Sequence, residues 1–181
     1  MANWSKHLIG VPAGVRSWLT DRASLTQKLR TGCVNFSVQG VRQRVGHLLA
    51  DESAIAGVSA TRTAWVREVT LTCADRPLVY AHSILPHGSL VGAWKLLMVL
   101  GARPLGASLF TDARVRRAQL EYCRLRARHP LYQRAVARLE YFPEFLWARR
   151  SQFWCGNRRI VVTEIYMPEI FSQQRYVNKD H

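Results

Sequence analysis

The stretch T-A-W-V-R-E-V-T-L-T-C, residues 63–73, alternates in the manner of a β-strand. One side of this strand carries Arg67 in a row of large apolar side chains, formed by Trp65, Val69 and Leu71. An arginine on a core face needs compensation, because desolvating its guanidinium group is costly. Two interpretations follow. Either Arg67 belongs to a buried ion pair or snorkels to the edge, or it is held in a dry pocket to receive a carboxylate or phosphate.

The composition bounds the class of protein without naming a ligand. The chain has 181 residues, of which 48% are hydrophobic, so it is long enough for one domain with a core. Its formal net charge of +14 favours anionic partners such as nucleic acid, a phospholipid surface or acidic metabolites.

The cysteines predict a cytoplasmic protein in which they are reduced. They stand at positions 33, 73, 123 and 155, with no C-x-x-C pair and no histidine at metal-ligand spacing, so no metal is expected. The amino terminus has no long apolar run, which argues against a secretory signal. The most apolar window, 90–100, is too short to span a bilayer.

The segments before the central strand predict two short helices, a hairpin and a loop. The helices cover 15–19 and 24–29, with Ser24 as the cap of the second; the hairpin pairs 34–39 with 42–48 around Gly40; the loop covers 50–61.

The segments after it predict further antiparallel strands with helices between them. The expected order is a strand over 78–85, a helix over 90–100, a glycine-bracketed loop over 101–106, a strand running into a helix over 113–128, a helix over 131–139, and a hairpin of 145–155 with 160–167. The fold class is therefore α+β, a single domain with a mainly antiparallel sheet.

The last of these strands carries Glu164 in an apolar row, as the central strand carries Arg67. If both face one cavity, Arg67 could bind a carboxylate, and Glu164 could meet a hydroxyl or a developing positive centre. A plain buried salt bridge gives the same pattern. Common nucleotide, zinc-protease and serine-hydrolase motifs are absent, and no acid completes a triad with His82 or His87 and the nearby serines.

Five segments, taken in order, resemble chorismate–pyruvate lyase, and the resemblance runs from about Trp18 to Pro168. They are W-V-R-E-V-T-L-T-C-A-D-R-P (65–77), S-I-L-P (83–86), G-A-R-P-L-G-A-S-L-F-T (101–111), W-A-R-R-S (147–151) and V-T-E-I-Y-M-P (162–168). The resemblance implies conversion of chorismate to 4-hydroxybenzoate and pyruvate at the start of ubiquinone synthesis. It also implies a six-stranded antiparallel sheet, a buried ligand beneath helical flaps, a tightly held product and no cofactor.

The same resemblance assigns four site residues. Arg67 takes the position that binds the ring carboxylate, and Glu164 the position that meets the 4-hydroxyl group. Leu105 takes the place of a backbone N–H donor, and Leu25 that of a flap residue, where the family pattern has methionine.

The chain also departs from the family pattern. Residues 123–140 read as an arginine-rich insertion in a domain that covers 1–168, and 169–181 as a polar, poorly ordered tail. His82 stands where the pattern has an arginine, so the cation for the enolpyruvyl carboxylate is open between Arg149 and Arg150.

Two other classes of function compete with the lyase. One is a non-catalytic effector-binding domain of the same fold, as found in some transcription regulators. The other is nucleic-acid binding through the arginines of 114–150, which is not expected because no nucleic-acid module is visible. A weak contact of this basic region with a membrane surface or a pathway enzyme is a further expectation, additional to catalysis.

Overall fold

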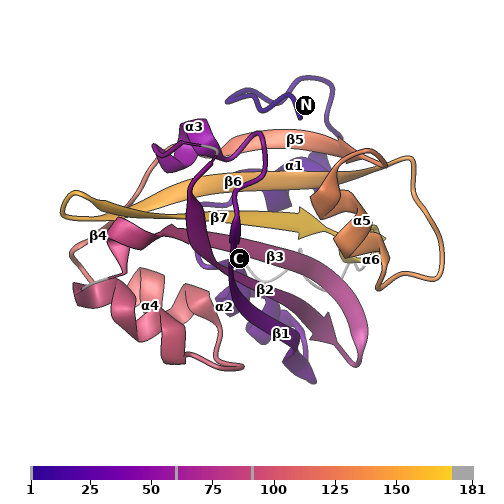
Figure 1. The fold of residues 1–181 in the computed structure, drawn as a ribbon. Helices are drawn as coiled ribbons and strands as arrows, with labels where there is room; N and C mark the ends of the chain where they lie inside the picture. The colour runs from indigo at the N-terminus through magenta and orange to yellow at the C-terminus, as the bar shows by residue number, and fades with distance from the viewer. Residues whose placement is uncertain (1, 60, 91, 173–181) are drawn as a thin grey trace.

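The structure is a computed structural model that describes residues 2–59, 61–90 and 92–172. Seven strands in this part of the chain form one antiparallel sheet in the order β1-β2-β3-β7-β6-β4, with β5 also paired to β6 (Figure 1). The strands are β1 (Phe36–His47), β2 (Thr63–Cys73), β3 (Arg76–Pro86), β4 (Val115–Arg117), β5 (Glu121–Arg126), β6 (Phe145–Cys155) and β7 (Arg158–Tyr166). Because β4 and β5 pair with successive parts of β6, the sheet is six strands wide, which confirms the predicted fold class.

The hairpin of β2 and β3 forms the middle of the sheet. Its two-residue turn, Ala74–Asp75, has positive φ angles of 47° and 63°, the backbone that a tight hairpin of this hand requires. Every residue from Ala64 to Thr72 is buried, because helices cover both faces of β2. Arg67 pairs with Ser83 across this hairpin.

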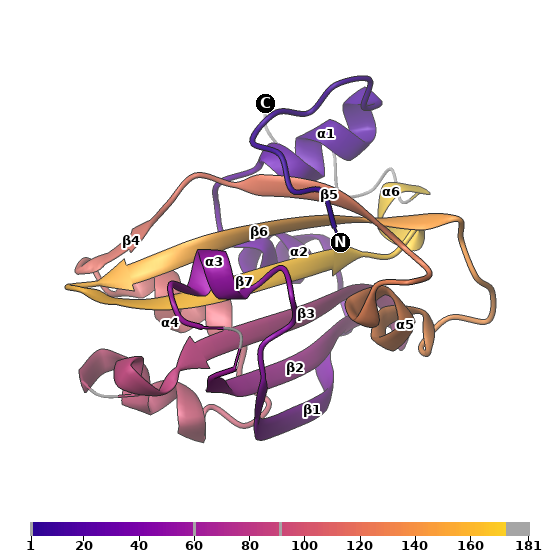
Figure 2. The same cartoon turned by 45° about the horizontal axis from the view of Figure 1, so that its top comes forward.

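The face of the sheet that carries Arg67 is covered by helices from two parts of the chain (Figure 2). They are α1 (Ala13–Thr20), α2 (Leu25–Gly32), the 3-10 helix η2 (Gly92–Val99) and α4 (Leu105–Thr111). The Ser24 side chain accepts a hydrogen bond from the amide of Gln27, as expected of a cap.

The opposite face is covered by α3 (Ser53–Ala56) and α5 (Pro130–Val136), which pack on separate apolar clusters. The short helices η1 (His87–Ser89) and α6 (Glu169–Ser172) complete the described part of the chain, in which no helix has the length and apolar character needed to cross a membrane.

The predicted hairpin around Gly40 is wrong. Residues 36–47 form the single strand β1, whose pairing with β2 is interrupted only between Gln39 and Arg42. Gly40 has a φ of +59°, so the glycine that suggested a turn makes an irregularity of the bulge kind instead.

Other predicted elements differ in type. The segment 113–128 forms β4 and β5 and no helix, and η2 has 3-10 geometry over most of 90–100. The predicted loop 50–61 contains α3. At the carboxyl end, Ile170 is buried within α6, whereas the rest of the expected tail, 173–181, lies outside the described residues.

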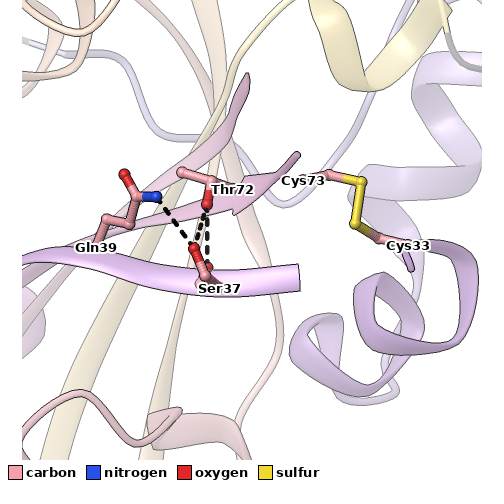
Figure 3. The surroundings of a disulfide bond; sticks show 5 residues. All are labelled: Cys33, Ser37, Gln39, Thr72 and Cys73. Atoms are coloured by element: carbon pink, nitrogen blue, oxygen red, sulfur yellow. Dashed lines mark hydrogen bonds between the residues drawn. A yellow bond between two sulfur atoms is a disulfide. The ribbon is translucent and has the colours of Figure 1, made fainter. Parts of the chain in front are cut away.

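The cysteines were expected to be reduced, and for two of them the structure contradicts this. Cys33 and Cys73 form a disulfide with a Cα–Cα distance of 5.8 Å (Figure 3). It joins the end of α2 to the end of β2, beside the hydrogen bond between the hydroxyls of Ser37 and Thr72 (2.7 Å). Cys123 and Cys155 are free thiols.

A buried ion network lies on the face opposite Arg67. The two ring nitrogens of His82 lie 2.9 Å from Glu52 Oε1 and 3.0 Å from Glu68 Oε1, and Glu68 also pairs with Arg134 (2.7 Å) and Arg44 (3.4 Å). Burial alone would raise the pKa of Glu68, but the hydrogen bond from His82 and the nearby positive charges lower it from 4.5 to about 2. Burial alone would lower the pKa of His82, but the two carboxylates raise it.

We expect the Cys33→Ser substitution to lower the free energy of unfolding by about 4 kcal/mol under oxidising conditions, because the disulfide closes a long loop in the unfolded chain. The sequence separation of 40 residues sets this value. Urea denaturation of both proteins, with and without dithiothreitol, measures it. Equal stability of the two proteins without reductant would contradict the prediction.

We expect Glu68→Gln to lower the free energy of unfolding by roughly 3 kcal/mol at pH 7, because Arg134 and His82 lose their anion. A carboxylate whose pKa is lowered on folding contributes stability above its ordinary pKa and loses it on acidification. The difference from the parent protein should therefore vanish as pH falls from 4.5 towards 2. Urea melts across this range test it.

The control for this experiment is Glu144→Gln, which removes an exposed ion pair with Arg126. It should change stability little at any pH, because surface pairs contribute little. An equal effect of both variants would show that burial of the network is unimportant.

Candidate active site

A cavity lies between the sheet and the helices α2 and α4. The cavity is narrow, with a volume of about 40 Å³ that the centre of a water molecule can occupy. All four site residues that the resemblance assigned line it. The lining residues are Leu25, Thr26, Arg67, Val69, Leu71, Ala81, Ser83, Pro104, Leu105, Gly106, Leu109, Phe110, Arg117, Phe153, Val162 and Glu164.

Arg67 enters this cavity from β2 and has no acidic partner among the described residues. Its side chain is buried, and its Nη2 donates to the backbone carbonyls of Gly101 (3.1 Å) and Arg103 (2.9 Å). Its Nε is buried without a hydrogen-bond acceptor in the described structure, and burial lowers its pKa. A guanidinium group that is desolvated and only partly satisfied can bind a carboxylate strongly.

Gly101 and Arg103 belong to the glycine-bracketed loop of residues 101–106. In the structure the backbone carbonyls of this loop approach Arg67. Gly101 has a φ of +52°, which permits the turn that presents these carbonyls. The loop therefore orients the guanidinium group.

Glu164 enters the cavity from β7. Its carboxylate forms an ion pair with Arg149, its cross-strand neighbour on β6, and lies 3.8 Å from Nη2 of Arg117. The side chain of Glu164 remains 14% exposed, so it is not sealed off by its partners. Arg67 and Glu164 thus face one space without neutralising each other.

Arg149 connects this carboxylate to helix α1. Its fully buried guanidinium donates through Nη1 to the backbone carbonyls of Trp18 (3.1 Å), Leu19 (3.4 Å) and Asp21 (2.5 Å). These carbonyls lie at or just past the carboxyl end of α1, where helix carbonyls lack partners within the helix.

The amino-terminal turns of α2 and α4 meet over the cavity. Leu25 and Leu105 are the first residues of these helices. A Cβ atom on Gly106 would lie 3.0 Å from the Ser24 hydroxyl and 3.2 Å from the Thr26 hydroxyl, so only glycine allows this approach without a shift. The first amide groups of a helix also have no acceptor within it, which leaves the Leu105 amide available.

Arg149 and Arg150, the two candidates for the cation that binds the enolpyruvyl carboxylate, do not line this cavity. Arg150 projects from the other face of β6, where it donates to Glu121 (2.8 Å) and to the Asp51 carbonyl (2.9 Å). Arg149 lies behind Glu164 and is not part of the cavity wall. His82, at the position where an arginine was expected, belongs to the ion network on the opposite face.

Arg117 is the charged residue of the described cavity wall that the sequence analysis did not predict. It lies on β4, which has only three residues, so no alternating pattern marks its side. It is also one of many arginines in its region, so the residue type alone does not distinguish it. Its pairing with Phe153 of β6 places it on the cavity side.

No group of three acidic, histidine or cysteine side chains in the described ranges is arranged to hold a metal ion. The charged groups on the cavity wall are two arginines and one glutamate, a set that suits an anionic organic molecule.

The fold is similar to those of two proteins of known structure. The C-terminal domain of PhnF matches with a TM-score of 0.57 at 14% identity, over 82% of this chain and 93% of that one. A GntR-family transcriptional regulator from Bacillus cereus matches with a TM-score of 0.54 at 9% identity, over 75% and 93%. At such identities the similarity concerns the fold alone.

Sequence comparison extends to curated relatives. A protein from Aromatoleum aromaticum is 44% identical over 162 residues, 88% of each chain, and one from Nitrosospira multiformis is 40% identical over 171 residues, 94% of this chain and 95% of that one. Both are named probable chorismate pyruvate-lyase. The family model for chorismate lyase matches residues 2–176. The chain therefore belongs to the chorismate lyase family, as the resemblance in its sequence predicted.

Proposed function

We propose that this protein is a cytoplasmic enzyme that converts chorismate to 4-hydroxybenzoate and pyruvate, the first committed step of ubiquinone synthesis. The observation that carries the proposal is the shared cavity of Arg67 and Glu164, which are not paired with each other. Membership of the chorismate lyase family supports the substrate.

The cavity offers complementary groups to the two ends of the ring. The ring carboxylate binds Arg67, whose buried Nε still needs an acceptor. The 4-hydroxyl group donates to Glu164 at the other end. The amide of Leu105 adds a backbone donor, and Leu25 covers the ring from α2. These contacts suit the product as well as the substrate, so we expect the product to be held tightly.

The reaction is an elimination that is neutral in redox terms. The electron pair of the C4–H bond becomes a ring double bond between C3 and C4. At the same time the C3–O bond breaks, and its electron pair leaves on the enolpyruvyl oxygen. The C4 proton finally reaches the methylene carbon of the leaving enol, which gives pyruvate. Because the ring becomes aromatic, the enzyme needs mainly to orient the substrate and stabilise the separating charge.

Two routes for the C4 proton are compatible with this site. Glu164 can accept it, with Arg149 fixing the carboxylate. Alternatively, the proton passes directly to the methylene group in a cyclic transfer, and Glu164 only holds the hydroxyl. Both routes use the same binding contacts.

A second candidate function is favoured by the fold. A GntR-family transcriptional regulator of similar fold suggests a non-catalytic module that binds a small effector. Incubation of the protein with chorismate, followed by the absorbance of 4-hydroxybenzoate, separates the two candidates.

Contact of the basic region 114–150 with an anionic membrane or a pathway enzyme stays a prediction. Several of its arginines have internal partners, namely Arg117, Arg134, Arg149 and Arg150. These acidic partners reduce the net positive charge that the region offers to another molecule. Co-sedimentation with anionic vesicles at low salt tests the membrane contact.

We expect Arg67→Ala to weaken 4-hydroxybenzoate binding by at least about 100-fold and to abolish useful turnover, because the ring carboxylate loses its charged partner. Calorimetric titration and a chorismate turnover assay measure the two effects. The control is Arg42→Ala, an exposed arginine of β1 outside this cavity, which should behave as the parent protein. Near-normal turnover by folded Arg67→Ala protein would refute the role.

We expect Glu164→Gln to lower kcat in a protein that still folds, with a lower melting temperature because the buried Arg149 loses its anion. The amide can still hydrogen-bond the hydroxyl group but can neither accept a proton nor stabilise positive charge. Steady-state kinetics with chorismate and a thermal melt measure both properties. Glu144→Gln, the same substitution at an exposed position, is the control. An unchanged kcat would remove Glu164 from the chemical step.

A further inference from the structure

Arg117 is a second cation in the cavity, and none of the contacts proposed above for the ring of the substrate involves it. With Arg67 and Glu164 it completes the charged groups on the described cavity wall. Its side chain is only 9% exposed, so placing it there required desolvation, and burial lowers its pKa. Its acidic neighbour Glu164 also pairs with Arg149, so in the described part of the chain two buried arginines share one carboxylate, and a second anion can bind beside Arg117.

The guanidinium group of Arg117 is rigidly positioned. It lies over the rings of Phe153 (5.1 Å) and Phe110 (5.6 Å). Its Nε donates to the Ser151 hydroxyl (2.9 Å), and its Nη1 donates to the Arg22 carbonyl (3.0 Å). Aromatic contacts and two hydrogen bonds therefore fix the plane and direction of the group.

Part of this group remains free to bind a ligand. A guanidinium has five N–H bonds, of which the Ser151 and Arg22 contacts use two. Its Nη2 is 3.8 Å from the Glu164 carboxylate, which is too long for a hydrogen bond. In the described part of the chain, the Nη2 hydrogens thus have no acceptor among the hydrogen bonds seen.

The position of Arg117 matches the chemistry of the proposed substrate. Chorismate has a second carboxylate on its enolpyruvyl arm, and the arm is attached at C3, next to the carbon that carries the hydroxyl group. Glu164 is the proposed partner of that hydroxyl, and Arg117 is the cation beside Glu164 on the cavity wall. In the sheet, β7 with Glu164 lies between β2 with Arg67 and β4 with Arg117.

We infer that Arg117 binds the carboxylate of the enolpyruvyl arm, through its free Nη2 edge. This inference rests on the proposed function, because it takes the substrate to be chorismate. Arg117 then discriminates substrate from product: the ring carboxylate and hydroxyl are common to both, whereas the arm carboxylate leaves with pyruvate. Loss of this contact after the reaction lets pyruvate depart while the ring product stays bound by Arg67 and Glu164.

Two ligands separate the arm contact from the ring contacts. 4-Hydroxybenzoate has only the ring groups, and 3-(carboxymethoxy)-4-hydroxybenzoate adds an ether-linked carboxylate at the carbon next to the hydroxyl. Titration calorimetry gives Kd values of both for the parent protein, Arg117→Gln and Arg117→Lys. The matched control is Arg116→Gln, the exposed neighbour on β4.

For Arg117→Gln, we expect the Kd of the ether-linked dicarboxylate to rise by at least about tenfold, with that of 4-hydroxybenzoate changing less than about threefold. Arg116→Gln should change neither. A parallel rise for both ligands would show that Arg117 only holds Glu164 in place, and would overturn the inference. So would an unchanged Kd, or a parent protein that binds neither ligand.

Arg117→Lys keeps the charge but loses the planar group, so it carries the test if Arg117→Gln does not fold. Its selective loss for the dicarboxylate should be smaller but present. Formation of 4-hydroxybenzoate from chorismate by the parent protein tests the proposed function separately. A parent protein that binds both ligands without turnover would refute the lyase reaction and leave the ligand comparison decisive for Arg117.

Discussion

The buried guanidinium group of Arg149 holds the candidate site together. It binds the Glu164 carboxylate on one side and three backbone carbonyls at the carboxyl end of α1 on the other. Removing a charge of this kind from water is costly, and the Glu164 carboxylate and the three carbonyls offset that cost. The same contacts place α1 against the sheet and aim Glu164 into the cavity. The position of α1 and the orientation of the Glu164 carboxylate therefore depend on the same side chain.

The two faces of the sheet use charge differently. On the face opposite the cavity, Glu68 and His82 both have oppositely charged partners within ion-pair distance. On the cavity face, Arg67 keeps a buried N–H without an acceptor in the described structure, and Arg117 keeps donors to spare. Charges paired within the chain contribute to the stability of the fold, whereas donors without an acidic partner of their own are available to a ligand. The alternation of β2 puts Arg67 and Glu68 on these opposite faces.

The sequence alone predicted the parts of the structure that strong periodicity governs. Alternation identified β2, the hairpin of β6 and β7, and the unusual positions of Arg67 and Glu164. It failed where one residue type has two structural uses: Gly40 has the positive φ of a turn but serves as an irregularity within β1. Arg117 escaped because three residues are too few to show a period.

The disulfide could not be predicted because its partners are 40 residues apart and meet only after β2 and α2 are placed. The role of His82 was likewise hidden, since its acidic partners come from a separate strand and from the segment before α3. Such long-range contacts follow from the three-dimensional arrangement and leave no local pattern in one sequence.

The Cys33–Cys73 link fixes one end of α2 to the sheet and leaves its other end, with Leu25, above the cavity. Any tilt of α2 that keeps this disulfide in place has to turn about the carboxyl end of the helix. Eight residues of helix are about 12 Å long, so a tilt of about 20° about this end lifts Leu25 by about 4 Å while the sulfur atoms barely move. The disulfide thus restrains the carboxyl end of α2 and leaves the placement of Leu25, at the other end, to non-covalent contacts.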